Sequence, residues 1–198
     1  MTLVVVARTR VDPGEDVVAS LRHLRVSGGS VDICEDRGRG EAVVWLPVED
    51  ASVAATLASS VPGVQDAWLA ERCTQWDGAP SPPDGQAVTG VKQVTFLRRA
   101  SGMDRAQFAH HWSTVHAPLA RVHHPALWRY RQSVVISPLL PSTPDDVDGV
   151  AELGMRLRLD FAERMYDSTE GQRIVGADVR TFLDLRRSSQ LVTREYRI

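Results

Sequence analysis

Five of the six histidines of the chain lie in one segment, Met103–His124. They are His110, His111, His116, His123 and His124. The apolar residues of this segment recur at helical spacing: Phe108, Trp112, Val115, Leu119 and Val122. At about 100° per residue, His111 and His116 fall at opposite edges of this apolar stripe and His110 points away from it. The pattern predicts a helix that turns two imidazole rings towards the protein interior.

Separate signals mark the start and the end of this helix. Asp104 can act as N-cap, and Gln107 three residues later completes a capping box. Pro118 removes one helix hydrogen bond, so we expect a kink and a free carbonyl group one turn earlier. His123 and His124 close the segment, where a cationic side chain is favourable for the helix dipole.

A half-buried imidazole titrates near neutral pH and can take or give a proton at an enolisable or phenolic carbon acid. His116 is the first candidate for this role, and His111 is the second. Each has a structural alternative. His116 could be bonded to a backbone carbonyl, and His111 could be a polar residue at the edge of the helix face.

A metal site and haem ligation by His116 are the less favoured readings of the histidine cluster. Two metal ligands on one helix face stand four residues apart. The gaps from His110 and His111 to His116 are six and five. We therefore expect no metal and no other cofactor.

Two further residues could assist proton transfer. Tyr130, if buried, needs a partner for its hydroxyl group, and a substrate carbonyl would serve. Glu152 lies among apolar residues in a predicted strand. If it is buried, its pKa is raised and it can act as acid or base; the alternative is an exposed glutamate at a sheet edge.

Several aromatic residues are candidates for lining a pocket for a planar ligand. Packing in the core is the alternative for each of them. The candidates are Trp112, Phe96, Trp128 and Phe108.

The first half of the chain predicts four strands and two helices in the order βαββαβ. The strands are expected at Thr2–Thr9, Ser30–Cys34, Glu41–Val48 and Val64–Trp76. The helices are expected at Glu15–Leu24, after a turn at 12–14, and from Asp50 or Ser52 through Leu57. A charged turn at 35–40 joins the second and third strands.

After a Pro/Gly-rich run at Gly78–Gly85, the second half repeats this order. Its strands are expected at Val91–Arg99, Trp128–Ser137, Gly149–Leu159 and Leu191–Ile198. Its second helix is expected at Phe161–Leu183, with a break at Ser168–Gly171. The division is therefore 1–77, a linker at 78–90, and 91–198.

Two βαββαβ units imply an α+β fold made of tandem ferredoxin-like units. Each sheet has helices on one face, and the companion sheet of the same chain is the nearest cover for the other face. We expect a cavity inside one half, between its sheet and its helices. The outer strands of both halves are expected to remain available for association, which leaves a homodimer open.

Composition limits the class of partner. The formal net charge is −2, which argues against a nucleic acid or an anionic membrane surface as the main partner. Cys34 and Cys73 are expected to be free thiols, and no signal sequence is visible, so we expect a cytoplasmic protein. No nucleotide-binding glycine loop and no nucleophile elbow occur in the sequence.

The second half, from about Val91 to Ile198, resembles an EthD-type domain of the dimeric α/β-barrel superfamily. The residues that carry the resemblance occur in a fixed order along the chain. They are Phe96–Arg99, Phe108, Trp112, His116–Leu119, Tyr130, Asp148–Leu153 and Ser168–Gly171. The first half lacks such motifs, which suggests that it substitutes for a partner subunit.

The resemblance implies a ferredoxin-like fold that pairs into barrels, and it places the recurrent histidine of the family at His116. Related proteins include isomerases, polyketide cyclases, decarboxylases and cofactor-free monooxygenases. The leading hypothesis is therefore a cofactor-free acid/base enzyme, a cyclase, isomerase or lyase, acting on a hydrophobic oxygenated metabolite of polyketide type. The alternatives are a cofactor-independent monooxygenase and a non-catalytic protein that binds a hydrophobic ligand.

Overall fold

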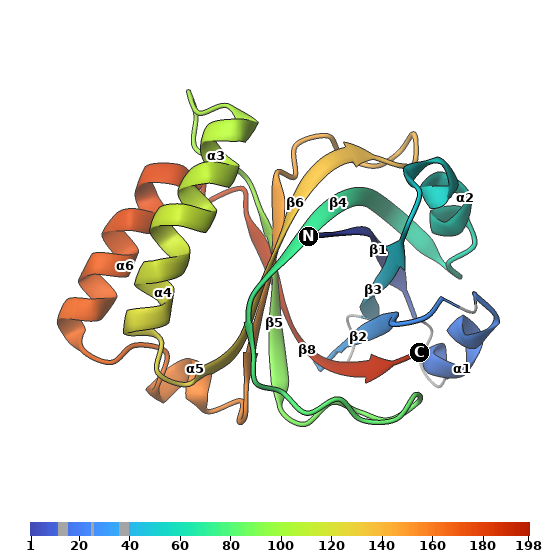
Figure 1. The fold of residues 1–198 in the computed structure, drawn as a ribbon, viewed down its shortest axis with the longest axis horizontal. Coiled ribbons are helices and arrows are strands. Elements are labelled where there is room, and N and C mark those ends of the chain that lie inside the picture. The colour runs from blue at the N-terminus through green and yellow to red at the C-terminus, as the bar shows by residue number, and fades with distance from the viewer. Residues whose placement is uncertain (12–15, 25, 36–39) are drawn as a thin grey trace.

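The chain forms one closed β-barrel with helices packed against its outside (Figure 1). The structure is a computed structural model that describes residues 1–11, 16–24, 26–35 and 40–198. The α+β class expected from the sequence is confirmed. The turn at 12–14, residue 15 and most of the charged turn at 35–40 lie outside the described residues.

Eight antiparallel strands make the barrel, in the order β1-β3-β2-β8-β5-β7-β6-β4. Their bounds are β1 Thr2–Arg10, β2 Ser30–Cys34, β3 Glu41–Val48, β4 Val64–Asp77, β5 Val91–Leu97, β6 Leu127–Pro138, β7 Gly149–Met155 and β8 Ser189–Arg197. The predicted strand at Gly149–Leu159 is therefore too long at its end. All eight strands were otherwise expected within two residues of where they lie.

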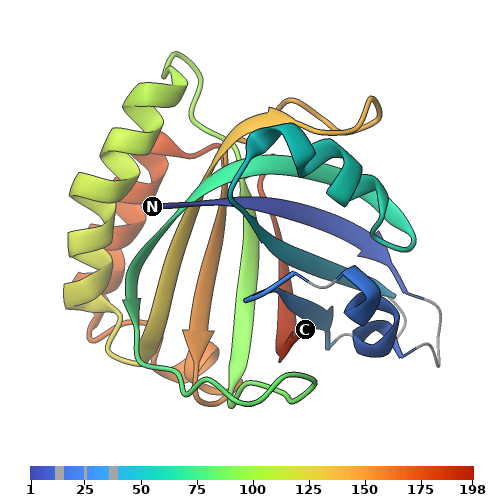
Figure 2. The same ribbon diagram turned by 45° about the vertical axis from the view of Figure 1, so that its right-hand side comes forward.

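Helices cover the two sides of the barrel separately (Figures 1 and 2). Two short helices, α1 Val17–Leu21 and α2 Ala54–Ser59, pack outside β1–β4. On the other side, α3 Arg105–His111, a π-helix at Trp112–His116 and α4 Ala117–His123 run beside α6 Thr169–Phe182, with the short α5 at Asp160–Glu163. The helical region is interrupted as expected, but the break lies at 164–168: Ser168 is the N-cap of α6, and the rest of the predicted break, 169–171, forms its first turn. None of the helices among the described residues is long and apolar enough to cross a membrane.

Each half of the chain contributes four neighbouring strands, and two seams join the halves. β4 pairs with β6, and β2 pairs with β8. These are the outer strands of the half-sheets, so the expectation that they remain free for association is wrong. The two halves share an element order and a strand order; their description as tandem ferredoxin-like units stays a prediction.

The inner faces of the half-sheets cover each other, as the sequence predicted. Trp45, Trp68 and Phe96 belong to the apolar cluster inside the barrel. Two other clusters lie outside it, each between one half-sheet and its own helices. The second of these clusters surrounds the histidine helix.

Candidate functional site

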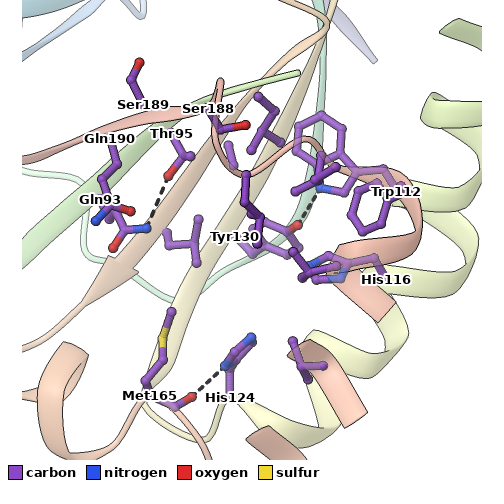
Figure 3. Close-up of a pocket in the computed structure, with 18 of the residues that line it drawn as sticks. Gln93, Thr95, Trp112, His116, His124, Tyr130, Met165, Ser188, Ser189 and Gln190 are labelled. Carbon is purple, nitrogen blue, oxygen red and sulfur yellow. Dashed lines mark hydrogen bonds between the residues drawn. The ribbon is translucent and has the colours of Figure 1, made fainter. Parts of the chain in front are cut away.

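A cavity of about 470 Å³ lies between the sheet of the second half and its helices (Figure 3). Its floor is the outer face of β5, β7 and β6, and α6 lines the opposite side. His116 and Tyr130 stand at one end, and Gln93, Thr95 and Gln190 lie at the other. The cavity therefore lies in the place predicted from the sequence.

His116 is held in the cavity wall by a carboxylate. Its Nδ1 atom lies 2.8 Å from Oδ2 of Asp178, which comes from α6. The side chain of Asp178 is 9% exposed. Burial lowers the pKa of His116, although the hydrogen bond and charge of Asp178 act in the opposite direction. The ring is therefore neutral at neutral pH, with its proton on Nδ1 towards Asp178 and a lone pair on Nε2.

His111 contacts the same carboxylate from the other side. Its Nε2 atom lies 2.7 Å from Oδ1 of Asp178, and its ring stacks on Phe182 with 4.8 Å between the centroids. His111 is not among the residues that line the cavity, so the structure brings it to the partner of His116 and not to a ligand. His110 is exposed, as predicted.

Tyr130 is buried at the cavity floor with its oxygen already serving as an acceptor. The indole N–H of Trp112 donates to it at 2.8 Å, and the side-chain amide of Gln132 donates at 3.1 Å. Burial raises the pKa of Tyr130 well above its ordinary value. The hydroxyl proton is therefore retained, and two donors on its oxygen make this O–H a stronger donor.

The helix that carries His116 departs from the regular pattern at one turn. The capping box of Asp104 and Gln107 is confirmed, but the π-helix at Trp112–His116 inserts one extra residue. The inward positions after Trp112 are therefore His116, Ala117 and Ala120, and not the predicted Val115, Leu119 and Val122. Val115 and Val122 are 42% and 65% exposed.

The π-helix also changes the hydrogen bonding of the Trp112 carbonyl group, which is not the carbonyl that Pro118 was expected to free near Thr114. The carbonyl oxygen of Trp112 accepts from the N–H of Ala117 five residues later and from the Gln132 amide at 2.9 Å. One side chain, Gln132, thus connects the wide turn with Tyr130. π-Helical turns are frequent at functional sites, and here the turn is what brings His116 to face the cavity.

Of the aromatic residues predicted to contact a ligand, only Trp112 lines the cavity. Phe96 faces the barrel interior, with its ring 5.5 Å from that of Trp68. Phe108 is fully buried between helix and sheet, and Trp128 lies outside the cavity with the Arg156 guanidinium over its ring. Strand alternation already places Phe96 on the opposite face of β5 from Gln93 and Thr95, which line the cavity. The alternation therefore predicts that Phe96 does not contact the ligand.

Glu152 is buried, but on the inner face of β7 and not in the cavity. Its carboxylate lies 2.7 Å from the amine of Lys92 and 3.0 Å from the guanidinium of Arg72. Burial raises the pKa of Glu152, but the charges of Arg72, Lys92 and Arg131 outweigh burial and hold the pKa well below its usual range. The expectation of a raised pKa is therefore wrong, because the sequence did not reveal these cations.

Two ionisable residues of the site were missed in the sequence. Asp178 shares one face of α6 with Val175, Val179 and Phe182, at the spacing i−3, i+1 and i+4, and an acidic residue inside such a stripe was the available signal. His124 was expected only to end the helix. It also lines the cavity, with Nδ1 bonded to the carbonyl oxygen of Met165. Burial lowers the pKa of His124.

Among the residues that the structure describes, no group of three or more histidine, cysteine, aspartate or glutamate side chains is placed to hold a metal ion. Cys34 and Cys73 are free thiols. The cavity lining can offer proton transfer by His116 and hydrogen bonding by Tyr130, Gln93 and Thr95.

Comparisons with known proteins match one part of the chain to a family model and the whole chain to solved structures of similar fold. The EthD domain model matches residues 100–186. A solved anthrone oxidase-like protein has a TM-score of 0.63 at 11% identity, over 98% of this chain and 91% of that one. A mutant chlorite dismutase from Candidatus Nitrospira defluvii in complex with cyanide has a TM-score of 0.52 at 12% identity, over 98% and 90%.

A solved EthD family protein from Bacillus halodurans matches 52% of this chain and 96% of its own, with a TM-score of 0.41 at 20% identity. No curated protein sequence matches the chain. The EthD resemblance seen in the sequence is confirmed by the domain model over residues 100–186, and the whole chain is similar in fold to the anthrone oxidase-like protein.

Proposed function

We propose that the chain is a cofactor-free acid/base enzyme that acts on a hydrophobic, oxygenated small molecule in the cytoplasm. His116 is its general base. The observation that carries this proposal is the His116–Asp178 pair at the wall of the cavity. A neutral imidazole whose Nδ1–H is fixed by a carboxylate presents its basic Nε2 in one orientation.

In the proposed reaction, Nε2 of His116 removes a proton from a carbon next to a carbonyl group or from a phenol. Asp178 stabilises the imidazolium that forms, and its second oxygen remains bonded to His111. The hydroxyl group of Tyr130 donates to the substrate oxygen on which negative charge develops. Return of the proton to another carbon gives isomerisation; attack of the carbanion within the substrate gives cyclisation, and loss of water or CO₂ gives a lyase reaction.

A cofactor-independent monooxygenase is the second candidate. The similarity in fold to an anthrone oxidase-like protein favours it. The same proton abstraction would give a carbanion, which reduces O₂. The balanced change converts a CH₂ group and O₂ into a C=O group and water. Oxygen consumption separates this reaction from the first.

The test is turnover of a panel of quinones and polyketide-like phenols by the wild-type protein and His116→Ala, with products identified by mass spectrometry. A product of unchanged mass, or one that has lost water or CO₂, supports the proposal if the variant does not form it. A product that has gained one oxygen and lost two hydrogens, with O₂ consumed, supports the monooxygenase. A ligand that binds both proteins unchanged supports a non-catalytic binding protein instead.

We also propose that the barrel is built from two ferredoxin-like units, with the first half in the position that a second subunit occupies in a dimeric barrel. The two seams, β4–β6 and β2–β8, support this assignment. The boundaries 1–77, 78–90 and 91–198 are kept for these units. Homodimerisation through the outer surface stays a proposal; sedimentation of the purified protein would test it.

A further inference from the structure

The floor of the cavity changes from polar to apolar and back to polar across three neighbouring strands. Gln93 of β5 is the register partner of Leu153 of β7, and Leu153 is the register partner of Tyr130 of β6. All three side chains line the cavity. A second row of register partners crosses β8, β5 and β7, from Gln190 through Thr95 to Ala151.

This register sets a length. Neighbouring strands lie about 4.8 Å apart, so the Gln93 and Tyr130 positions are separated by two spacings, or about 10 Å. Between them the floor is Ala151 and Leu153, and Val175 and Val179 of α6 line the cavity as well. An apolar layer with apolar walls on both sides accepts a flat body of fused rings.

The end opposite His116 carries neutral hydrogen-bonding groups. The Gln93 amide donates to the Thr95 hydroxyl oxygen at 3.2 Å. Among the described residues this is the one hydrogen bond of the Gln93 side chain, so its carbonyl oxygen and its second N–H are free to bind a ligand at this end of the cavity (Figure 3). Both Gln93 and Thr95 are half-buried, whereas Gln190 is exposed at the rim.

The cavity also selects by charge. The described residues that line it include no lysine, arginine, aspartate or glutamate. A charged substituent placed on the ligand at the Gln93 end would lose hydration without gaining an opposite charge. A hydroxyl or carbonyl group would gain a donor and an acceptor.

We infer that the cavity binds an uncharged, flat, fused-ring molecule with oxygen substituents at both ends, one at His116 and Tyr130 and the other at Gln93 and Thr95. This inference deepens the proposed function, because it takes the His116 end as the reacting end. Gln93 and Thr95 form a specificity subsite. They favour a ligand that is long enough to reach them and that carries an oxygen substituent at its far end.

The test is a binding measurement with two fluorescent probes that differ in one hydroxyl group, 2-naphthol and 2,6-dihydroxynaphthalene. Fluorescence anisotropy gives the affinity of each for the full chain. We expect the diol to bind the wild-type protein about three- to tenfold more tightly, the worth of one ordinary hydrogen bond. Gln93→Leu should reduce that ratio to less than twofold, while its affinity for 2-naphthol stays within twofold of wild type.

Two further variants keep the result interpretable. Thr95→Val has nearly the shape of the native residue and should lower the ratio in part. Gln65→Leu makes the same change as Gln93→Leu at an exposed position in the other half of the chain and should leave the ratio unchanged. Ionised 6-hydroxy-2-naphthoate should bind at least tenfold more weakly than the diol, because its carboxylate is desolvated without a cation.

Equal affinities of the two naphthols for the wild-type protein, an unchanged ratio in Gln93→Leu, or no binding of either probe would overturn the inference. These outcomes are distinct from failure of the proposed function. If His116-dependent turnover is found but the diol and 2-naphthol bind with equal affinity, the subsite is wrong and the proposed function stands. If the diol binds more tightly as expected but no turnover is found, the subsite stands and the protein binds its ligand without reaction.

Discussion

At the scale of single residues, the site depends on one carboxylate that serves two imidazoles. His116 and His111 bind the two oxygens of Asp178, at 2.8 and 2.7 Å. The position of the histidines in the helix predicted that they turn inward. It did not predict their partner, because Asp178 lies 62 residues after His116 and nothing local links the two.

Replacing Asp178 by asparagine keeps the size of the side chain and removes its charge. We expect kcat/KM to fall by about 100-fold or more, because the imidazole loses the group that fixes its tautomer and stabilises its cation. Activity requires neutral His116 and is lost as the pH falls through the pKa of that group. Asp178 raises this pKa, so the acid limb of the rate profile should move to lower pH in the variant.

The matched control for this variant is Asp167→Asn. Asp167 bonds His123 at 3.2 Å, its side chain is 38% exposed, and neither residue lines the cavity. Its replacement should leave both the rate and the acid limb within twofold of wild type. A drop of equal size in both variants would mean that the loss reflects the fold and not the orientation of His116.

At the scale of elements, the sequence predicted where the histidine helix begins and failed where it widens. The start depends on a capping box, which four consecutive residues specify. The π-helix depends on long-range contacts: the side-chain amide of Gln132 in β6 donates a hydrogen bond to the Trp112 carbonyl oxygen. The extra residue in the π-helix rotates all later positions about the helix axis. The apolar pattern of the sequence, read at regular α-helical spacing, therefore assigned the wrong residues after Trp112 to the buried face.

The same helix lies very close to the start of β7. A Cβ atom built on Gly149 would stand 2.6 Å from the Trp112 ring and 3.1 Å from the Phe108 ring. Gly149→Ala should therefore push the helix outward and lower the free energy of unfolding by about 1–3 kcal/mol. Urea denaturation measures this change, and ligand binding should weaken with it.

Gly176→Ala in α6 is the control for that prediction. The nearest atom that its Cβ would meet, on Arg180, is 3.6 Å away, and glycine in a helix interior is less favourable than alanine by about 0.5–1 kcal/mol. This variant should be as stable as wild type or more so. If both alanines are tolerated equally, the helix is not held against β7 as described.

At the scale of the whole molecule, local patterns predicted the strands but not the closure of the barrel. Alternation and turn residues locate β2 and β8 well, yet nothing in either strand indicates that residues 30–34 pair with 193–197. The charges inside the barrel were hidden for the same reason. Lys92 meets Asp32, Glu152 and Glu195, at 2.7, 2.7 and 3.1 Å, from three other strands.

The closed barrel predicts a single unfolding transition. Both seams tie one half to the other, and one apolar cluster is shared by both inner faces. Calorimetry should therefore give one peak whose calorimetric and van't Hoff enthalpies agree. Residues 1–77 produced alone should not fold, whereas two separable peaks for the full chain would contradict the shared core.

The buried charges predict how stability varies with pH. Burial raises the pKa of Asp32 from 3.8 to about 6, with Lys92 acting in the opposite direction. In the folded protein this carboxyl holds a proton that the unfolded chain has already lost. Its stabilising contribution is therefore complete below pH 3.8 and is lost as the pH rises through about 6.

Asp32→Asn removes this titration. Wild type should lose about 2 kcal/mol of its free energy of unfolding between pH 4.5 and pH 7.5 through this group, and the variant should not. The free energy of unfolding of the variant relative to wild type should therefore be about 2 kcal/mol higher at pH 7.5 than at pH 4.5. The opposite contributions of Glu152 and Glu195, whose pKa values are lowered, remain in both proteins. Urea denaturation at the two pH values measures the difference; no change with pH would mean that Asp32 is ionised throughout.

The joining of two unlike halves in one chain has a consequence for how the barrel can evolve. A barrel assembled from two copies of one chain receives every substitution twice, once in each wall. Here the first half, residues 1–77, has a single histidine, His23, and the His116–Asp178 pair occurs once per barrel. A mutation in the wall that holds the cavity is not repeated in the opposite wall, so the reactive side can diverge while the other side preserves the fold.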